Sequence, residues 1–368
     1  MKKNDTTILI LGGYGSVGRT FSRLLLTETS VKIIIAGRNS EKAESFVSQL
    51  KQEFPNKHIT SCYADATKYD SLIKAFINVQ LVVVLTTTPK AIPLIGQAAL
   101  ASGCDYLDIL VSDTTYSDLS KFAPSIAEQK RTFITQAGFH PGLPAVFIRS
   151  AAQYFDKYES ATIAIAMNAR FERAEQAAEI IPLIADFNAD ICVNGFWREA
   201  TYKDARRIDM GATWGKMLLY PMQMAEIKKI QQLLSIPNVG VYISGFNWFV
   251  DYLVMPIIFI TQKIKTGFAS KLLCQLFAWG VNTFSSGHRG VVFLNEAEGV
   301  KDGKKIKIRI VAEHQDAYLF TAIAVVACVK QYLSGTLPIG LWFMGHAVDD
   351  KQLLDDLEKM QVHFDNVL

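Results

Sequence analysis

The sequence predicts an α/β fold whose first half is a doubly wound parallel sheet, and three observations lead to this prediction. Short apolar runs alternate with helical patterns through the first half of the chain, a glycine-rich turn follows the first run, and this rhythm ends after Pro144. Buried strands that each lead into a helix are typical of a parallel sheet covered on both faces. With 368 residues, the chain is long enough for about two domains and a smaller third piece.

The first elements follow from the spacing of apolar residues. Residues 8–11 form an apolar run that ends in glycines, and Val17, Phe21 and Leu25 then recur at helical spacing. A second strand and helix follow in the same way. The remaining strands of this half are expected at 31–36, 58–63, 81–85, 106–111 and 132–136, with helices over 43–50 and 92–99.

The second half predicts a mixed α+β arrangement. Strands are expected at 161–167 and 196–203, with a helix over 174–185 between them. A hairpin is expected from 291–299 and 305–312, because Asp302-Gly303 supplies residues that favour a tight turn. A buried helix over 316–333 and an amphipathic helix over 351–360 complete the chain.

Composition excludes several classes of function. The 38 basic and 35 acidic residues give a net charge of +3, which is too small to favour a nucleic-acid partner. The five cysteines are scattered without a Cys-x-x-Cys pair, and no zinc-ligand spacing occurs, so we expect no metal site. An odd number of scattered cysteines favours a cytoplasmic protein, and the short polar N-terminus is unlike a signal peptide.

The glycine-rich turn is the strongest chemical signal. Gly13-Tyr14-Gly15-Ser16-Val17-Gly18 matches G-x-G-x-x-G and lies between the first strand and the first helix. In this motif the first glycine permits the tight turn, the second lets the backbone approach a pyrophosphate, and the third allows close helix packing. The turn therefore predicts a bound dinucleotide, with its pyrophosphate at the helix N-terminus.

The end of the second strand favours NADP(H). NAD and FAD proteins usually place an acidic residue there for the ribose 2′-hydroxyl, whereas this chain has Ala36-Gly37-Arg38, followed by Asn39 and Lys42. A guanidinium suits a 2′-phosphate because it can form a charge-assisted fork. The alternative is that Arg38 and Lys42 are solvated surface cations.

Three polar residues after the third and fourth strands are further cofactor candidates. Asp65 is placed to accept from the adenine amino group, although it could equally cap a helix. Thr86 and Thr87 follow the fourth strand at the edge where open α/β sheets bind ligands. Their hydroxyls could line the ribose and the nicotinamide, and turn chemistry alone would also explain them.

A short-chain dehydrogenase is disfavoured, because no tyrosine here has a lysine four residues later. Several other motifs occur in different parts of the chain: residues 12–19, Ala36-Gly37-Arg38, Tyr106-Leu107-Asp108, residues 137–144, residues 298–303, residues 318–321 and residues 340–345. Together these motifs resemble the saccharopine dehydrogenase family, which includes saccharopine reductases and saccharopine dehydrogenase-like oxidoreductases.

The resemblance implies a domain organisation and an activity. It implies a Rossmann domain over 1–143, an inserted α+β domain over 144–315 for substrate and dimer contacts, and a helical segment over 316–368 that returns to the first domain. The implied activity is hydride transfer between NADP(H) and a small-molecule substrate, at a C–N bond in the reductases. Where the reductases typically carry an acidic residue before Pro-Gly, this chain has His140.

Hydride transfer to an imine or a carbonyl requires a proton donor, and three residues are candidates. His140 can titrate near neutral pH, and Asp108 could hold or charge it, with Tyr106 beside them. The alternatives are structural. His140 could bond a backbone carbonyl beside Pro141-Gly142, Tyr106 could pack in the core, and Asp108 could cap a helix that begins near Ser112.

The segment 246–284 is dense in large apolar residues, but its charges and Pro256 divide it into pieces too short to span a membrane. It could be buried core or a dimer interface, a pocket for a hydrophobic substrate, or a surface in peripheral contact with a membrane. Two further functions therefore stay open beside C–N chemistry. One is an enoyl (C=C) reductase on an acyl or lipid-like substrate, and the other is a non-enzymatic NADP-binding sensor or scaffold at a membrane.

Overall fold

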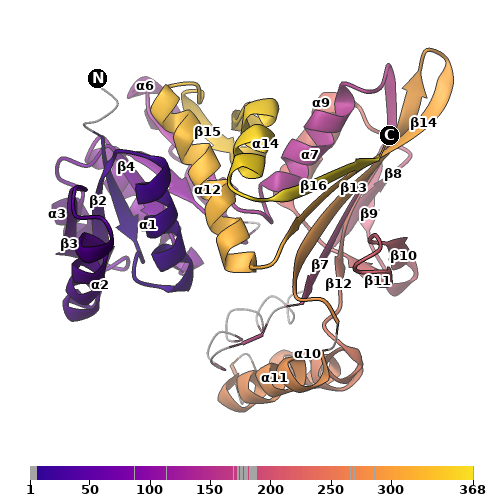
Figure 1. Ribbon diagram of the computed structural model, residues 1–368, viewed down its shortest axis with the longest axis horizontal. Helices are drawn as coiled ribbons and strands as arrows, with labels where there is room; N and C mark the ends of the chain where they lie inside the picture. The colour runs from indigo at the N-terminus through magenta and orange to yellow at the C-terminus, as the bar shows by residue number, and fades with distance from the viewer. Residues whose placement is uncertain are drawn as a thin grey trace. The chain divides into compact units, whose positions relative to one another are not determined.

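The structure is a computed structural model that describes residues 6–86, 88–112, 114–168, 170–171, 174, 177, 181, 189–265, 267–268, 270–285 and 287–367. The chain divides into two compact units (Figure 1). Unit 1 comprises Met1–Ser150 and Tyr318–Gln361, and unit 2 comprises Ala151–Ala317 and Val362–Leu368.

Unit 1 is built on a seven-stranded sheet in the order β15-β6-β5-β4-β1-β2-β3, and every neighbouring pair is parallel. The order reverses between β1 and β4, so the ligand-binding crevice of such sheets is expected at the carboxyl ends of these two strands. The predicted doubly wound sheet is therefore confirmed. Its strands are β1 (Thr7–Leu11), β2 (Lys32–Gly37), β3 (Ile59–Tyr63), β4 (Leu81–Val84), β5 (Asp105–Asp108), β6 (Thr132–Thr135) and β15 (Gly340–Phe343).

Both faces of this sheet are buried. Leu9 and Val82 belong to a core that also contains side chains of α3, α4 and α5, while Ile8 and Ile10 on the opposite face are equally buried. The helices of unit 1 are α1 (Ser16–Glu28), α2 (Ser40–Glu53), α3 (Tyr69–Ala75), the short η2 (Pro89–Ala91), α4 (Ile92–Ala101), α5 (Thr115–Ser120), α6 (Ala123–Glu128), α7 (Leu143–Ala152), α12 (Ala317–Ser334), α13 (Met344–Ala347) and α14 (Asp350–Lys359).

Helix α12 is the predicted buried helix, and it ties the end of the chain to the first helix. Lys330 on α12 forms ion pairs with Glu28 of α1 at 3.4 Å and with Asp356 of α14 at 2.9 Å. Within the described part of the chain, α12 is the one helix long and apolar enough to cross a bilayer, by length and composition alone. Its Phe320 and Ile323 are fully buried in the protein, as in the core helix of a folded domain.

Unit 2 is built on a mixed sheet in the order β10-β11-β12-β7-β13-β14-β16, with β8 and β9 paired beside β12. The β7–β12 pair is parallel and the other pairs are antiparallel. The strands are β7 (Lys157–Asn168), β8 (Asp190–Val193), β9 (Phe196–Glu199), β10 (Arg206–Asp209), β11 (Lys216–Pro221), β12 (Asn238–Ser244), β13 (Gly290–Lys301), β14 (Lys304–His314) and β16 (His363–Val367).

The predicted hairpin is present as β13 and β14. Asp302 and Gly303 have φ values of 50° and 72°, so two left-handed residues form the turn, as a type I′ hairpin requires. Pairing runs from Lys301 with Lys304 to Val291 with His314.

Two expectations for unit 2 need correction or lie outside what is described. The strand expected over 196–203 ends at Glu199, because Thr201 and Asp204 form a capping box around the short helix η4 (Tyr202–Asp204). Most of the helix expected over 174–185 lies outside the described residues.

The C-terminal segment is not wholly helical, in contrast to the expectation for 316–368. It contributes β15 to the edge of the unit 1 sheet, where Leu341 pairs with Phe133. It also contributes β16, which pairs with β14 in unit 2. Both are short edge strands, and their pairing depends on partners far away in the sequence.

The helices of unit 2 are α9 (Ala225–Leu234), the π-helical η5 (Val250–Val254), α10 (Met255–Ile264) and α11 (Ser270–Phe284). Figure 1 shows α10 and α11 side by side, beyond the ends of β12, which precedes them, and β13, which follows them. Val250, Val254 and Ile258 form a small separate core with Leu273 and Phe277.

Candidate functional site

The glycine-rich turn lies where β1 ends and α1 begins. The Gly12 N–H donates to the Ala36 carbonyl at 2.8 Å, and the Gly15 N–H donates to the Gly12 carbonyl at 2.9 Å. A Cβ on Gly18 would lie 2.4 Å from the Gly12 oxygen, and a Cβ on Gly13 would lie 3.0 Å from the Ile10 oxygen. These two glycines are therefore required by the turn itself.

Gly15 differs from Gly13 and Gly18, because the position that a Cβ would occupy at Gly15 faces open space. A Cβ there would meet a single atom within 4 Å, the Gly12 oxygen at 3.2 Å, and both Gly15 and Ser16 are exposed. Gly15 is also the N-cap of α1, and neither a side-chain cap nor an acidic residue in the first turn occupies the helix N-terminus. The first-turn N–H groups, including those of Ser16 and Val17, can therefore receive an anion. This site fits the pyrophosphate of a dinucleotide.

Tyr14 connects the turn to the end of β2. Its ring lies against Gly37, where a Cβ would come within 2.5 Å of the ring. Its hydroxyl accepts the Asn39 N–H at 3.0 Å, so the hydroxyl proton remains to be donated elsewhere. The Asn39 side chain accepts the Lys42 N–H at 2.8 Å and thereby caps α2, so this side chain has a structural task.

Arg38 and Asp65 bring opposite charges to this edge of the sheet. The Arg38 side chain is exposed, while the Asp65 carboxylate accepts the Thr67 N–H at 3.0 Å and the Thr67 hydroxyl at 2.8 Å. These hydrogen bonds, with the positive charges of Lys68 and Arg38, hold the pKa of Asp65 below its usual range. Asp65 thus forms a local turn with Thr67 and is not the cap of α3, whose N-cap is Lys68, and it lies within the electrostatic field of Arg38.

The end of β4 lies beside the glycine-rich turn. The Leu85 N–H donates to the Leu11 carbonyl at 2.9 Å, and a Cβ on Gly12 would lie 3.0 Å from the Thr86 methyl group. Thr88 donates to the Thr86 hydroxyl at 3.1 Å. Thr86 is therefore adjacent to the turn, whereas Thr87 lies outside the described residues.

Tyr106 and Asp108 form a buried pair at the end of β5. The Tyr106 hydroxyl donates to Asp108 Oδ2 at 2.9 Å, and Asp108 Oδ1 accepts the N–H groups of Leu110 at 3.0 Å and Gln136 at 3.2 Å. Burial raises the pKa of both groups. The carboxylate thus joins the ends of β5 and β6. The expectation that Asp108 holds or charges His140 needs correction, because its described hydrogen bonds go to these other groups.

His140 lies in the loop after β6, and its ring is only partly exposed. It stacks on Phe139 with ring centroids 4.1 Å apart, and Phe139 in turn stacks on Phe320 of α12 at 5.4 Å. The His140–Pro141 peptide bond is cis. Burial lowers the pKa of His140 to about 4, so the imidazole is neutral at pH 7. This pKa lies below the near-neutral range expected from the sequence.

Sequence reasoning missed Gln136, which connects two loops of the site. It has a left-handed φ of 58°, and its Nε2 donates to the Ser112 carbonyl at 2.8 Å. Its buried Oε1 has no hydrogen-bond partner within the described part of the chain, so it is an acceptor that a ligand could use. No sequence motif pointed to Gln136, because a left-handed glutamine at a strand end has no local signature.

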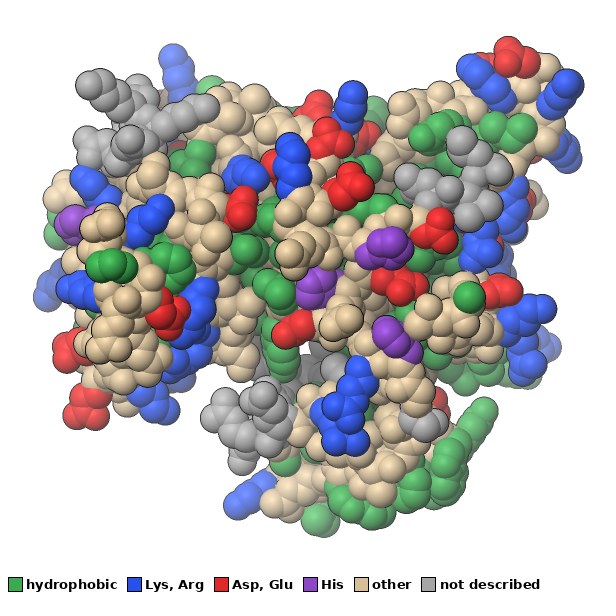
Figure 2. Space-filling view, viewed as in Figure 1, with side chains coloured by type: hydrophobic (Ala, Val, Ile, Leu, Met, Phe, Trp, Pro, Cys, Tyr) green, Lys and Arg blue, Asp and Glu red, His purple; other side chains and the backbone are tan. Residues whose placement is uncertain are grey.

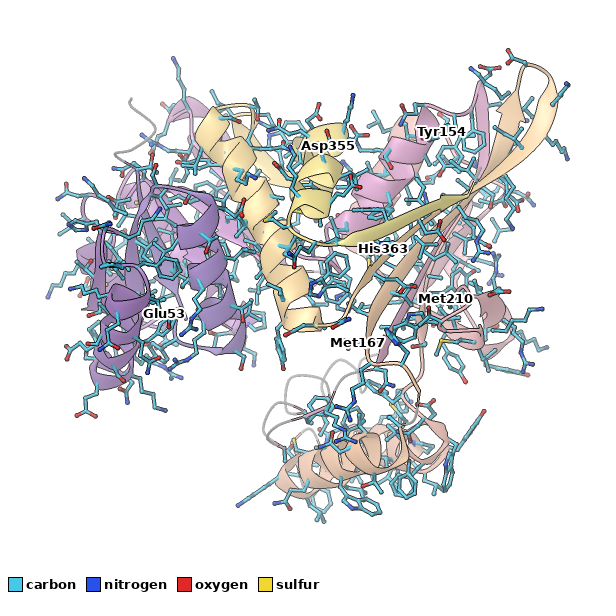
Figure 3. The ribbon with its side chains drawn as sticks, in the orientation of Figure 1. Glu53, Tyr154, Met167, Met210, Asp355 and His363 are labelled. Carbon is cyan, nitrogen blue, oxygen red and sulfur yellow. The ribbon has the colours of Figure 1, made fainter. Side chains whose placement is uncertain are left out.

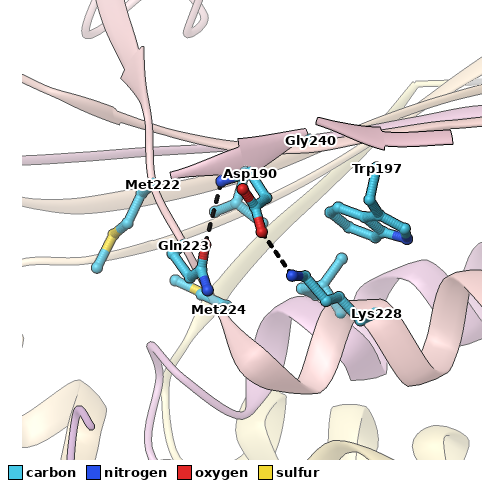
Figure 4. Close-up of a pocket in the computed structure, with 9 residues that line it drawn as sticks. Asp190, Trp197, Met222, Gln223, Met224, Lys228 and Gly240 are labelled. Carbon is cyan, nitrogen blue, oxygen red and sulfur yellow. Dashed lines mark hydrogen bonds and ion pairs between the residues drawn. The ribbon is translucent and has the colours of Figure 1, made fainter. Parts of the chain in front are cut away.

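Unit 2 contains a small, shallow pocket between β8, β12 and α9. Figure 4 shows that its polar groups already pair with one another: Lys228 forms an ion pair with Asp190 at 2.5 Å, and the Gln223 amide oxygen accepts the Asp190 N–H at 3.1 Å. Lys228 also lies 5.4 Å from the centre of the Trp197 ring. These contacts stabilise unit 2, and they already pair the two charged side chains of this pocket with each other.

Comparison with known proteins identifies the first part of the chain. Residues 8–137 match the family model of the saccharopine dehydrogenase NADP binding domain. A search of curated proteins gives no match.

Comparison with solved structures extends the similarity in fold to the rest of the chain. Apo saccharopine dehydrogenase (L-Glu forming) from Saccharomyces cerevisiae superimposes with a TM-score of 0.69 at 13% identity, covering 99% of this chain and 100% of that one. The C. glutamicum DAP dehydrogenase in complex with DAP gives a TM-score of 0.46 at 12% identity, covering 97% and 99% of the two chains. An engineered D-amino acid dehydrogenase bound to NADP+ gives 0.49 at 11% identity, covering 97% and 100%.

The first of these likenesses extends the saccharopine dehydrogenase fold to both units. The family model adds the nucleotide, because it matches the part of the chain that holds the glycine-rich turn and Arg38. The chain therefore carries a domain that matches the saccharopine dehydrogenase NADP binding domain, and it is an NAD(P)-dependent oxidoreductase.

Proposed function

We propose that the protein transfers hydride between NADP(H) and a small-molecule substrate at a C–N bond. The observation that carries the choice of cofactor is the pairing of the uncapped N-terminus of α1 with the exposed Arg38, in a chain that has no acidic residue at the end of β2. When bound, NADPH supplies the hydride. The choice of a C–N bond rests on the resemblance to saccharopine reductases and on the saccharopine dehydrogenase fold.

The proposed cofactor site follows the carboxyl ends of the first four strands. The backbone of the glycine-rich turn receives the pyrophosphate, and Arg38 with the Tyr14 hydroxyl receives the 2′-phosphate, since both groups donate from the end of β2. Asp65 then faces the adenosine part, and the Thr86 hydroxyl lies along the ribose. The full set proposed is Gly13, Tyr14, Gly15, Ser16, Val17, Gly18, Arg38, Asn39, Asp65, Thr86 and Thr87.

For the chemical step we propose His140 as the proton-transfer group. Its imidazole is neutral at pH 7 and so has a free ring nitrogen that can accept a proton from the substrate nitrogen or oxygen in the oxidative direction. Tyr106 and Asp108 act as positioning residues, because they hold the loop after β6 through the Gln136 N–H and are themselves fully buried.

The cofactor proposal is tested by calorimetric titration with NADPH and NADH. Arg38→Ala removes the charge proposed to bind the 2′-phosphate, and we expect NADPH affinity to fall about tenfold to a hundredfold while NADH affinity stays within about twofold. Lys51→Ala is the matched control, because Lys51 is an exposed cation in the last turn of α2. An equal loss for both nucleotides, or the absence of binding in the unmodified protein, would contradict the proposal.

The bond type is tested by NADPH oxidation with imines, aldehydes and enoyl thioesters. Consumption with pairs of an amine and a 2-oxo acid supports C–N chemistry, whereas consumption with enoyl thioesters favours the C=C alternative. Tight NADPH binding without consumption by any class favours the non-enzymatic sensor or scaffold. A homodimer and a cytoplasmic location stay predictions, and light scattering after size-exclusion chromatography measures the first of them.

A further inference from the structure

Helices α10 and α11 expose an apolar surface that the oxidoreductase activity does not explain. We call it the outer face and define it by Tyr252 of η5, which runs directly into α10, by Ile257, Ile260 and Ile264 of α10, and by Leu272 and Trp279 of α11. Ile264 is 78% exposed, Tyr252 67% and Leu272 65%. Figure 2 shows hydrophobic side chains along this edge of the helix pair, and Figure 3 shows side chains projecting from it on the side away from Met167.

The outer face is additional to the core that holds the two helices together. Val250, Val254 and Ile258 are already buried against Leu273 and Phe277 on the other side. The first helix is therefore apolar on both sides, which is unusual for a helix at a water-exposed surface. Single exposed apolar side chains need no explanation, but a contiguous group along two adjacent helices indicates an interaction surface.

The charges beside the outer face have one sign. Lys263, Lys265 and Lys271 are exposed, and they gather at the turn between α10 and α11, next to the exposed Phe268. The single acidic residue of the segment is Asp251, and its carboxylate is turned inward to accept the Phe246 N–H at 2.9 Å. The outer face therefore presents apolar groups and cations without an exposed carboxylate.

This charge pattern distinguishes between possible occupants. In a twofold interface the same patch meets itself, so the lysines of both copies would enter an interface to which neither copy brings an exposed carboxylate. An anionic phospholipid surface complements both features, because headgroup phosphates attract lysines and the interface accepts apolar side chains. Tyr252 and Trp279 also have the amphipathic rings that favour the headgroup level.

We propose that the outer face docks on the surface of an anionic phospholipid bilayer. Ile257, Ile260, Ile264 and Leu272 enter the boundary between headgroups and acyl chains, while the three lysines extend to the phosphates. The contact is peripheral and is independent of the identity of the substrate.

Vesicle flotation tests the charge component. The full-length protein is mixed with vesicles of phosphatidylcholine alone or with 30% phosphatidylglycerol (about 70:30) at low and moderate salt. We expect binding to the anionic vesicles, weakened by salt, and a loss of roughly tenfold or more in Lys263→Glu/Lys265→Glu/Lys271→Glu. The matched control is Lys51→Glu/Lys74→Glu/Lys130→Glu, which makes the same change in net charge with exposed lysines of unit 1. An equal loss in the control would overturn the proposal.

Tryptophan fluorescence tests the apolar component. Trp248 and Trp279 are exposed on this helix pair, so their emission should shift to shorter wavelength with anionic vesicles and be quenched by brominated lipid. Trp248→Phe/Trp279→Phe should abolish the shift, since the other tryptophans lie elsewhere. Ile260→Ser/Ile264→Ser should lose vesicle binding and remain folded, with Leu233→Ser as the control for an exposed apolar residue of α9.

A measurement of the oligomeric state distinguishes a bilayer from a second copy of the chain as the partner of the outer face. If the unmodified protein ignores both kinds of vesicle, and Ile260→Ser/Ile264→Ser converts a dimer into a monomer, the outer face is a contact between copies and the proposal fails. If the unmodified protein ignores both kinds of vesicle and the assembly is unchanged, the proposal also fails.

Discussion

The ring of Tyr14 lies directly against the backbone of Gly37, so that a Cβ at position 37 would come within 2.5 Å of the ring. This contact joins the glycine-rich turn to the end of β2, where Asn39 also donates to the Tyr14 hydroxyl at 3.0 Å. The two parts of the proposed NADP site, for the pyrophosphate and for the 2′-phosphate, therefore depend on a residue without a side chain at position 37.

Gly37→Ala should weaken NADPH binding while the protein remains folded. The added methyl group displaces the end of the Tyr14 side chain, which can move, so we expect the free energy of unfolding to change by less than about 1 kcal/mol. Loss of the Tyr14 contacts at the 2′-phosphate should lower NADPH affinity by about fivefold or more. Calorimetry and urea denaturation measure the two effects, and Tyr14→Phe should reproduce part of the loss of affinity. Unchanged affinity in Gly37→Ala would remove Tyr14 from the site.

Gly18→Ala should mainly lower stability, whereas Gly15→Ala should mainly weaken NADPH binding. Gly18→Ala places a Cβ 2.4 Å from the Gly12 oxygen, so we expect it to lower the free energy of unfolding by about 1–3 kcal/mol. Gly15→Ala meets one atom at 3.2 Å and should change the stability by no more than about 0.5 kcal/mol, yet it should weaken NADPH binding at least about tenfold because it occupies the open side of the turn. Thermal unfolding with and without NADPH separates the two effects, and similar behaviour of both variants would contradict the assignment.

Much of unit 1 could be predicted from the sequence, because its signals are local. Each strand is a short apolar run followed by a helical pattern, and the position of the glycines between β1 and α1 follows from the order of residues alone. The chain around Arg38 predicted NADP because the presence or absence of an acid at the end of a strand is visible in the sequence.

The features that the sequence did not predict depend on contacts between residues far apart in the chain. Strands β15 and β16 have four and five residues, and a short edge strand is defined by the partner beside it. The left-handed φ of Gln136 and the neutral state of His140 likewise result from packing around the loop after β6. The sequence identified Tyr106 and Asp108 as neighbours of the site, but it could not show that their polar atoms bond to each other.

The Tyr106–Asp108 pair should be more sensitive to loss of the carboxylate than to loss of the hydroxyl. Tyr106→Phe removes one buried hydrogen bond and should lower the free energy of unfolding by about 0.5–1.5 kcal/mol. Asp108→Asn replaces one carboxylate oxygen with an NH2 group. That oxygen is either the acceptor of the Leu110 and Gln136 N–H groups or the acceptor of the Tyr106 hydroxyl, so we expect the free energy of unfolding to fall by about 1–3 kcal/mol. Both variants should retain NADPH binding. A variant with full stability but no turnover would instead place the pair in the chemistry.

His140 should make the protein less stable as the pH falls below neutrality. Its pKa is lowered to about 4 by burial, while the unfolded chain has the ordinary value near 6.5, so between these values the unfolded state binds a proton that the native state does not. The free energy of unfolding should therefore be unaffected above about pH 6.5 and fall by about 1–3 kcal/mol towards pH 4 from this group. In His140→Gln this part of the pH dependence should disappear, whereas His58→Gln, at an exposed histidine, should retain it. Urea denaturation of the three proteins at about pH 4.5, 5.5 and 7 measures how the free energy of unfolding changes with pH. These values are chosen to cover roughly the range between the two pKa values. Parallel curves for the unmodified protein and His140→Gln would show that the imidazole is accessible enough to protonate in the native state, and it could then also serve as a proton donor.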